Sequence, residues 1–205
     1  MANGIRLDLA TAARWTGGER RGADAGFTGV GTDSRTLEPG RLFIALVGPN
    51  HDGHDHLEAA ARAGAAGAVV ARPRTDLDLP QVVVADTRAA LADLARAWRR
   101  QCGPTVVAVT GSNGKTTVKE MLAAVLGRMG PTLATRGNLN NEIGVPLTLL
   151  RLTPEHRYAV VEMGANHPGE IAALAAIAEP QVGVVTNAGP AHLEGFGTVE
   201  GVARA

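Results

Sequence analysis

The stretch Thr110-Gly-Ser-Asn-Gly-Lys-Thr-Thr117, here called the phosphate loop, decides the fold of this chain. The apolar run 105–109 precedes it, and a segment with helical periodicity follows it. A strand that turns through glycines into a helix beginning Gly-Lys-Thr typically binds phosphate, because backbone N–H groups at the helix N-terminus point at the anion. Lys115 adds a positive charge, and the Thr116 hydroxyl is placed to ligate Mg²⁺. The stretch therefore predicts a nucleotide site at the end of a strand.

The phosphate loop departs in one position from the broad pattern, which has a glycine five residues before Gly114, where this chain has Val109. A shorter glycine loop is therefore expected. The apolar residues that follow repeat at helical spacings and predict a single apolar stripe on a helix that ends at Gly130-Pro131. They are Val118, Met121, Leu122, Val125, Leu126 and Met129. A structural turn is the alternative, and the flanking strand and helix favour nucleotide binding.

The composition indicates neither a basic nor an acidic partner. The 205 residues include 20 basic and 20 acidic side chains, so no nucleic-acid or anionic-membrane surface is expected. Lys115 and Lys119 are the only lysines. The single cysteine, Cys102, excludes an internal disulfide and fits a reducing compartment, with a packing role favoured over a nucleophile. Without a signal-peptide pattern or a membrane-spanning apolar run, a cytoplasmic protein with no membrane insertion is expected.

Strand-like and helix-like segments alternate along the chain, which predicts an α/β fold with mainly parallel sheet. In the first part the pattern predicts strands at 42–46, 68–70 and 82–84 and a helix at 56–63. Asp55 is the expected N-cap of that helix. The composition changes after Gly103-Pro104, where the unit with the phosphate loop begins. We assign the helix before it to the same unit, which places the domain boundary near Ala85 and gives domains at 1–85 and 86–205. A boundary at 102–104 is the alternative.

The second part begins with a helix capped by Asp86-Thr87, whose apolar face is Leu91, Leu94, Ala95 and Trp98. Beyond the phosphate loop the pattern predicts strands at 132–135, 158–163 and 182–186 and helices at 145–150 and 168–178. In open parallel sheets ligands bind outside the carboxyl ends of the strands. The unusual polar residues follow these strands, so we expect them at one edge: the phosphate loop, Asn138, Asn141, Glu162 and 187–192.

Glu162 ends an apolar strand and is the best candidate for a magnesium ligand, because Mg²⁺ takes hard oxygen ligands and needs only one or two carboxylates. A helix cap or a salt bridge is the alternative. His192 lies in a glycine-rich loop, where a single histidine is more often a surface residue than a ligand. The segment His51-Asp-Gly-His-Asp-His56 has the composition of a metal cluster, but its spacing favours a glycine-centred turn before a helix.

Several segments together resemble the Mur ligase family. They are 110–121, Gly137-Asn-Leu-Asn-Asn-Glu-Ile-Gly-Val-Pro146, Glu162-Met-Gly-Ala-Asn-His-Pro-Gly-Glu-Ile171, Ala191-His-Leu-Glu-Gly-Phe-Gly197, and the run 32–46 with Asp52-Gly-His54. The resemblance covers about Thr32 to the last residue. It implies a small N-terminal α/β domain that binds a uridine nucleotide, followed by a mainly parallel P-loop ATPase domain.

The resemblance also implies an ATP- and Mg²⁺-dependent ligase of peptidoglycan precursor synthesis. ATP would phosphorylate the terminal carboxylate of UDP-N-acetylmuramoyl-tripeptide, and the amine of D-alanyl-D-alanine would attack the resulting acyl phosphate. The block 138–144 favours this dipeptide-adding member over its sister, which adds the third amino acid. A non-catalytic module that binds a UDP sugar is the other alternative. A monomer without a nucleic-acid partner is expected.

The family's functional residues correspond to three sets in this chain. The catalytic set is Lys115, Glu162 and His192, and the metal ligands are Thr116, Glu162 and His192. The ATP-binding set is Gly111, Ser112, Asn113, Gly114, Lys115, Thr116, Thr117, Asn138 and Asn141. The set that would contact the uridine diphosphate is Asp33, Ser34, Arg35, His51 and His54, although an ordinary Asx turn at 33–35 is the alternative.

One family feature is missing. A lysine, modified to a carbamate that bridges to a second magnesium, follows the His-Leu-Glu-Gly-Phe-Gly block in the family, and this chain reaches Ala205 about where it should appear. The chain is therefore expected to be a fragment, with an incomplete ATP-binding domain, no third domain and little activity by itself.

Overall fold

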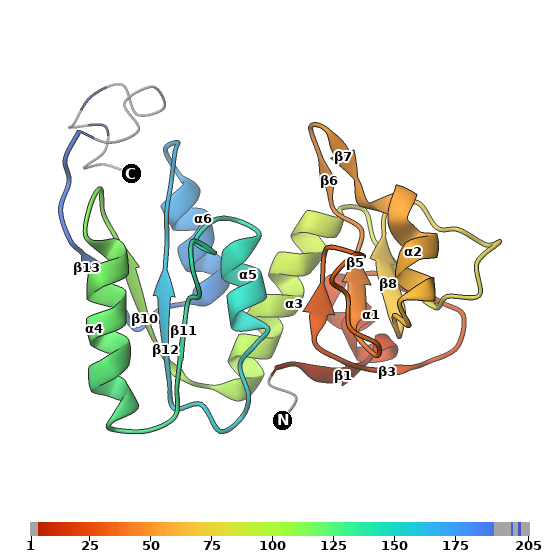
Figure 1. The fold of residues 1–205 in the computed structure, drawn as a ribbon, viewed down its shortest axis with the longest axis horizontal. Helices are drawn as coiled ribbons and strands as arrows, with labels where there is room; N and C mark the ends of the chain where they lie inside the picture. The colour runs from red at the N-terminus through yellow and green to blue at the C-terminus, as the bar shows by residue number, and fades with distance from the viewer. Residues whose placement is uncertain (1–3, 191–197, 199–200, 202–205) are drawn as a thin grey trace. The chain divides into compact units, whose positions relative to one another are not determined.

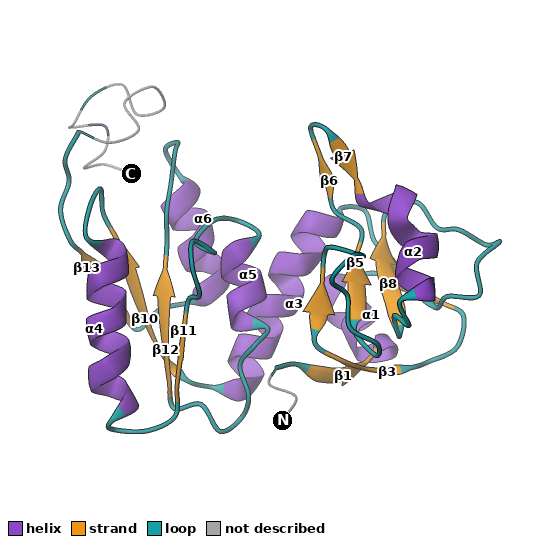
Figure 2. Ribbon diagram, in the orientation of Figure 1, coloured by secondary structure: helices purple, strands orange, loops and turns teal. Residues whose placement is uncertain are grey.

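A computed structural model describes residues 4–190, 198 and 201 of the chain. It divides into two compact units, Met1–Ala97 and Trp98–Ala205, which are described separately below. Both mix helices with sheets that contain parallel strands, so the predicted α/β class is confirmed (Figures 1 and 2).

The division between the units falls inside helix α3 (Thr87–Cys102). The Thr87 hydroxyl at the start of this helix donates to the Ala45 carbonyl of the first unit (2.9 Å), and Trp98 Nε1 donates to the Leu152 carbonyl of the second (3.0 Å). One continuous helix thus contributes to both units. The boundary expected near Ala85 stays a proposal.

The first unit is built on a five-stranded sheet in which a single strand, β2, is antiparallel to its neighbour. In sheet order the strands are β2 (Glu19–Arg21), β9 (Gln81–Val83), β8 (Gly67–Val70), β5 (Leu42–Ile44) and β4 (Val30–Gly31). Two antiparallel ribbons accompany it: β1 (Arg6–Asp8) with β3 (Gly26–Thr28), and β6 (Val47–Gly48) with β7 (His51–Asp52). The helices are α1 (Leu9–Thr16), the 3₁₀ turn η1 (Gly53–His56) and α2 (Leu57–Arg62).

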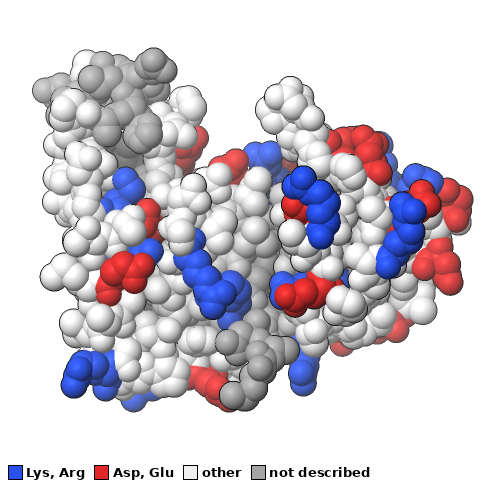
Figure 3. All heavy atoms as spheres, viewed as in Figure 1, with Lys and Arg blue, Asp and Glu red and all other residues white. Residues whose placement is uncertain are grey.

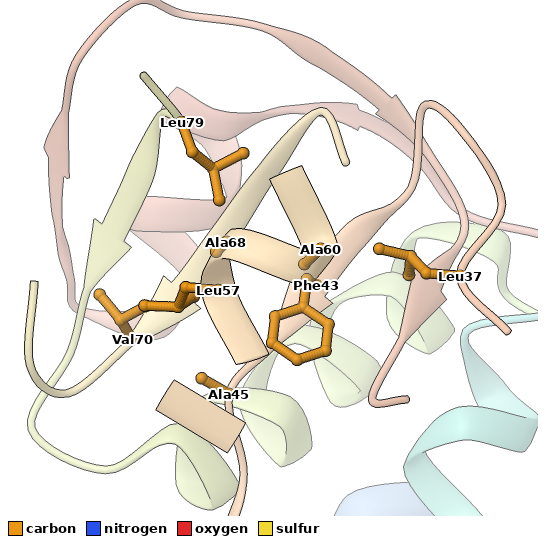
Figure 4. Packing of buried hydrophobic residues seen from close by; sticks show 8 residues of the cluster. All are labelled: Leu37, Phe43, Ala45, Leu57, Ala60, Ala68, Val70 and Leu79. Carbon is orange, nitrogen blue, oxygen red and sulfur yellow. The ribbon is translucent and has the colours of Figure 1, made fainter. Parts of the chain in front are cut away.

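The core of the first unit lies between the inner strands and helix α2, and Figure 4 shows eight of its side chains. They are Leu37, Phe43, Ala45, Leu57, Ala60, Ala68, Val70 and Leu79. Strands β5 and β8 are buried along their whole length, which is why they read as continuous apolar runs rather than as alternating ones. The predicted strands at 42–46, 68–70 and 82–84 are therefore confirmed, with shifts of one or two residues at their ends.

The expectation that Asp55 caps the helix at 56–63 is wrong. The 3₁₀ turn η1 begins before that helix, and the Asp52 side chain caps this turn by accepting from the His54 N–H (2.9 Å). Helix α2 follows directly and has no side-chain cap. A hydrogen-bonded turn in front of the helix has moved the capping position three residues toward the N-terminus.

The second unit is built on a four-stranded sheet in which every pairing is parallel. In sheet order the strands are β11 (Thr132–Ala134), β12 (Tyr158–Glu162), β10 (Thr105–Thr110) and β13 (Val182–Val185). The helices are α4 (Lys115–Gly127), α5 (Gly144–Leu149) and α6 (Glu170–Ala178). The carboxyl ends of all four strands share one edge, here called the carboxyl edge, as predicted. Strands β11 and β12 lie on one side of β10, and β13 lies on the other. The strand order therefore reverses at β10, and the phosphate loop follows this strand.

Helix α4 corrects the predicted apolar stripe. Met121, Val125 and Met129 are 64%, 60% and 59% exposed, whereas the side chain buried on this helix is that of Lys119. Val118, Leu122 and Leu126 are half-buried. The apolar residues of the helix occupy two rows on its surface, because spacings of three and four residues repeat around a 3.6-residue turn, and one row is exposed. Met129 lies beyond the last residue of the helix.

Candidate functional site

Glycine is required at two positions of the phosphate loop. Gly111 has φ +132°, and a Cβ there would lie 2.2 Å from Thr186 Oγ1 and 2.9 Å from the Asn187 carbonyl oxygen. Gly114 has φ +78° and is the N-cap of helix α4. Side chains at either position would strain the backbone, so the loop needs both residues to turn from β10 into α4.

The segment after β13 braces the phosphate loop. Ser112 donates from its N–H to the Asn187 carbonyl (3.0 Å), and its hydroxyl exchanges hydrogen bonds with the backbone of Gly189 (2.9 and 3.1 Å). The Asn113 N–H donates to Asn187 Oδ1 (3.1 Å), and Thr186 Oγ1 donates to the Asn113 carbonyl (2.6 Å). These bonds fix the loop and occupy the N–H groups of Ser112 and Asn113, so any direct ATP contact by these two residues stays a prediction.

The second half of the loop keeps donors for an anion. The first N–H groups of an α-helix have no partner within the helix, and here they belong to Lys115, Thr116 and Thr117. Thr116 and Thr117 are exposed. The Lys115 ammonium donates to the Gly111 carbonyl (2.7 Å) and approaches that of Ser112 (3.4 Å), so its charge lies over the loop. This arrangement suits a phosphate group bound at the helix N-terminus.

Glu162 lies beside the loop at the end of β12. Glu162 is paired with Val109 of the neighbouring strand β10, and it is only 2% exposed. Its Oε2 accepts from the Thr116 hydroxyl (3.0 Å), and its Oε1 accepts from Asn140 Nδ2 (2.9 Å). Two candidate ligands for a cation, 46 positions apart in the sequence, are thus in direct contact.

The donor set fits Mg²⁺. Hydroxyl and carboxylate oxygens are the hard ligands that this ion prefers, and it keeps several waters or takes phosphate oxygens at its other positions. Among the described residues no group of three or more His, Cys, Asp or Glu side chains is placed to hold a metal. The segment 51–56 therefore forms no such group in the structure. His192, the other predicted ligand, lies outside the described residues.

The asparagines of the second unit are arranged differently from the sequence-based assignment. Asn140, which was not singled out, makes the bond to Glu162. Asn141 Oδ1 instead accepts from the N–H groups of Ile143 and Gly144 at the start of α5 (3.3 and 2.9 Å), and Asn138 is exposed. The three asparagines lie within one segment of turns. The backbone conformation, rather than the residue type, decides which of their side chains reaches Glu162.

A pocket of about 420 Å³ in the first unit brings together most of the residues expected to contact a uridine nucleotide. It is lined by Thr32, Asp33, Ser34, Arg35, Phe43, His51 and His56. The rings of His51 and His56 stack, with centroids 4.8 Å apart and planes inclined by 17°. His56 and Phe43 were not assigned to the nucleotide site from the sequence, because a stacked histidine and a buried phenylalanine have no local motif for such a role.

Asp33 and Arg35 form both an Asx turn and an ion pair. Asp33 Oδ1 accepts from the Arg35 N–H (3.0 Å), and Arg35 Nε and Nη2 contact the two carboxylate oxygens at 2.9 and 2.7 Å. Hydrogen bonds from the Arg35 side chain, and then from its backbone N–H, hold the pKa of Asp33 well below its usual range. The Arg35 side chain is 86% exposed, so the turn presents a guanidinium to solvent at the pocket.

His54 does not line this pocket. It is buried, its Nδ1 contacts Asp52 Oδ1 (2.7 Å), and its Nε2 accepts from the N–H groups of Ala71 and Arg72 (2.9 and 3.3 Å). Because Nε2 accepts, the proton of the neutral ring lies on Nδ1 and donates to the carboxylate. The geometry indicates a bracing role for His54, and substrate contact by it stays a prediction.

Replacing Asp52 with alanine is expected to destabilise the first unit by about 1 kcal/mol at pH 7, because the η1 turn loses its cap. The His54 N–H, followed by the His54 ring and the Arg72 guanidinium, lowers the pKa of Asp52 from its ordinary 3.8. A carboxylate with a lowered pKa stabilises the fold above its unfolded-state pKa, and this contribution is lost as the pH falls. Urea unfolding of both proteins at pH 7 and at about pH 2, well below the unfolded-state pKa, checks this, and a stability difference that does not shrink at the lower pH would contradict it.

Two other expectations concern reactivity and membranes. Burial raises the pKa of the Cys102 thiol to about 11, so it is protonated at neutral pH, in keeping with a packing role. Among the described residues, no helix has both the length and the apolar character that crossing a bilayer requires. Side chains of both signs are scattered over the face shown in Figure 3.

Comparison with known proteins agrees with the fold. The family described as "Mur ligase middle domain" matches residues 109–205, and "Mur ligase family, catalytic domain" matches residues 26–99. The chain belongs to the Mur ligase family, which confirms the resemblance found in its motifs.

Individual relatives have a more specific description. The UDP-N-acetylmuramoyl-tripeptide–D-alanyl-D-alanine ligase of Escherichia coli (strain K12) is 56% identical over 189 residues, which are 92% of this chain and 41% of that enzyme. A crystal structure of MurF from Acinetobacter baumannii matches with a TM-score of 0.94 and 43% identity, covering 99% of this chain and 46% of that one. MurF ligase from Thermotoga maritima in complex with ADP matches with a TM-score of 0.78 and 39% identity, covering 85% and 41%. The chain spans about two fifths of the length of the curated relatives it matches.

Proposed function

We propose that this chain provides the ATP site and the UDP-substrate site of an ATP-dependent ligase that adds D-alanyl-D-alanine to UDP-N-acetylmuramoyl-tripeptide. The observation that carries the proposal is the contact between the Thr116 hydroxyl and the Glu162 carboxylate at the mouth of the phosphate loop (3.0 Å). A structural turn would not require a buried carboxylate there. The 56% identity to the Escherichia coli enzyme supports the same reading.

In this proposal each candidate site residue of the second unit has a separate role. The N–H groups of residues 115–117 bind the phosphates of ATP, and the Lys115 ammonium neutralises charge that develops on the transferred phosphoryl group. Thr116 and Glu162 hold Mg²⁺, which when bound offsets the charge of the phosphates. Asn140 donates to Oε1 of Glu162 and so orients the carboxylate with Oε2 toward Thr116. The acceptor carboxylate becomes an acyl phosphate, which the amine of the dipeptide attacks.

The first unit would bind the nucleotide end of the tripeptide substrate. Arg35 presents a guanidinium suited to a diphosphate, and the stacked rings of His51 and His56 offer a flat surface to a base. The pocket volume of about 420 Å³ falls in the range of small-molecule sites. We further propose that the protein acts in the cytoplasm as a monomer without a nucleic-acid partner.

Replacing His56 with alanine is expected to weaken binding of UDP about three- to tenfold, because a stacking aromatic pair contributes roughly 0.5–1.5 kcal/mol. Isothermal titration calorimetry on the 205-residue chain measures this. His167→Ala is the matched control, since His167 is a largely exposed histidine of the second unit. Equal affinities of His56→Ala and wild type would show that UDP does not use this surface.

Ligation is tested with a chimaera in which this chain replaces the matching region of the Escherichia coli enzyme. We expect phosphate release that depends on ATP, on UDP-N-acetylmuramoyl-tripeptide and on D-alanyl-D-alanine together. Product formation from the dipeptide nucleotide and a diamino acid would identify the sister activity instead. A chain that binds the UDP sugar but ignores magnesium-ATP in calorimetry would be a non-catalytic binding module, which would contradict the proposal.

A further inference from the structure

Lys119 is the one charged residue of helix α4 that is buried among the described residues, at 1% exposure. The chain has only two lysines, and this one lies one helical turn after Lys115 of the phosphate loop. It lies within the segment whose periodicity predicts an apolar stripe. A buried ammonium is unfavourable unless it is paired and hydrogen-bonded, so its partners indicate its role.

The Lys119 ammonium has three oxygen partners. It donates to the Thr135 carbonyl just after β11 (3.0 Å) and pairs with Glu120 Oε1 (2.8 Å), whose side chain is 65% exposed. It also lies 4.0 Å from Glu162 Oε2, the oxygen that accepts from Thr116. Of the two carboxylates, only that of Glu162 is buried with it, so the pair inside the protein is Lys119 with Glu162.

The same cluster holds the end of β12 independently of Lys119. The Thr135 hydroxyl accepts from the Glu162 N–H (3.0 Å), and Asn140 and Thr116 bind the two carboxylate oxygens. The position of Glu162 is therefore fixed by three hydrogen bonds that would remain if the lysine were neutral. Lys119 adds a positive charge near Oε2 of Glu162.

We propose that Lys119 is a positioning residue of the divalent-ion site that acts through Glu162: its charge lowers the affinity of the Thr116–Glu162 pair for a divalent ion in the absence of nucleotide. The inference rests on the proposed function, since it takes this pair as the ion site. Oppositely charged neighbours stabilise an ionised carboxylate, and a resident cation opposes a second one at the same oxygen. Nucleotide phosphates supply further ligands, so the ion binds tightly only together with the nucleotide.

Replacing Lys119 with methionine is expected to tighten binding of Mn²⁺ to the nucleotide-free chain about tenfold. Mn²⁺ substitutes for Mg²⁺ at oxygen sites, and electron paramagnetic resonance of the free ion measures its affinity without any activity assay. Lys119→Gln, whose amide still donates toward Thr135, should show the same change because it also removes the charge. The two variants separate the effect of the charge from that of the hydrogen bond to Thr135. The glutamine variant also keeps the test valid if the methionine variant does not fold.

Two controls complete the test. Arg128→Met removes the same charge from the exposed C-terminal end of the helix, nine residues and about 14 Å farther along it, and should leave Mn²⁺ affinity unchanged. In a Glu162→Gln background, Lys119→Met should no longer change it, because the coupling runs through that carboxylate.

The outcomes distinguish the two proposals. Mn²⁺ binding that is unchanged or weaker in both folded Lys119 variants overturns the role of the lysine, as does a change seen with methionine but not with glutamine. A wild-type chain that shows no Mn²⁺ binding in the presence of ADP, beyond that of ADP alone, overturns the ion site of the proposed function itself.

Discussion

Replacing Lys115 with alanine is expected to lower kcat for ligation about 10²–10³-fold in the chimaera with the Escherichia coli enzyme, the usual consequence of removing one preorganised charge from a transition state. The ammonium lies over the phosphate loop, where it contacts two carbonyls that solvent can also satisfy. Its removal therefore affects the transferred phosphoryl group more than the fold. We expect KM for the UDP substrate to stay within about twofold, because that pocket belongs to the other unit.

The comparison variant for this experiment is Arg128→Ala, which removes an exposed positive charge from the far end of the same helix. It should retain wild-type kcat. Initial rates of phosphate release at varied ATP and UDP-substrate concentrations separate kcat from KM. Undiminished ligation by Lys115→Ala would reject the assignment of the phosphate loop to phosphoryl transfer.

The parts of the site that the sequence predicts are those set by local chemistry. Gly111 and Gly114 adopt positive φ angles that other residues rarely adopt, so their presence before a lysine and a threonine specifies the turn. Glu162 follows an apolar strand, and parallel strands end at one edge, so its place beside Thr116 follows from the topology. The family match confirms the resemblance to the Mur ligases, and the roles of these residues stay predictions.

The parts that the sequence does not predict depend on which way a side chain points. Asn140 rather than Asn138 or Asn141 reaches Glu162, and the Asn141 side chain instead accepts from the backbone N–H groups of residues 143 and 144. Lys119 is buried on a helix whose Met121 is exposed, and its charged partner Glu162 lies at the end of strand β12, against which the helix packs. Tertiary contacts made over tens of residues decide such cases, and a local window of sequence contains no information about them.

Phe43 gives the largest effect that we expect on stability. Its replacement by alanine should destabilise the first unit by about 3–5 kcal/mol, because a buried phenylalanine loses its transfer free energy and leaves a cavity. The ring is 1% exposed, lies in the cluster of Figure 4 and also contributes to the wall of the pocket that we propose for UDP. Phe43→Leu, which keeps most of the volume, is expected to cost less than about 1.5 kcal/mol.

The measurement must report the first unit alone, because a chain of two units need not unfold in one step. The chain has two tryptophans, Trp15 in α1 and Trp98 in the second unit, so a Trp98→Phe background leaves Trp15 as the reporter. Urea unfolding followed by its fluorescence should shift to a lower midpoint in Phe43→Ala with an unchanged slope. A loss below about 1 kcal/mol would mean that neighbouring side chains fill the space, and that Phe43 shapes the pocket without being required for the fold.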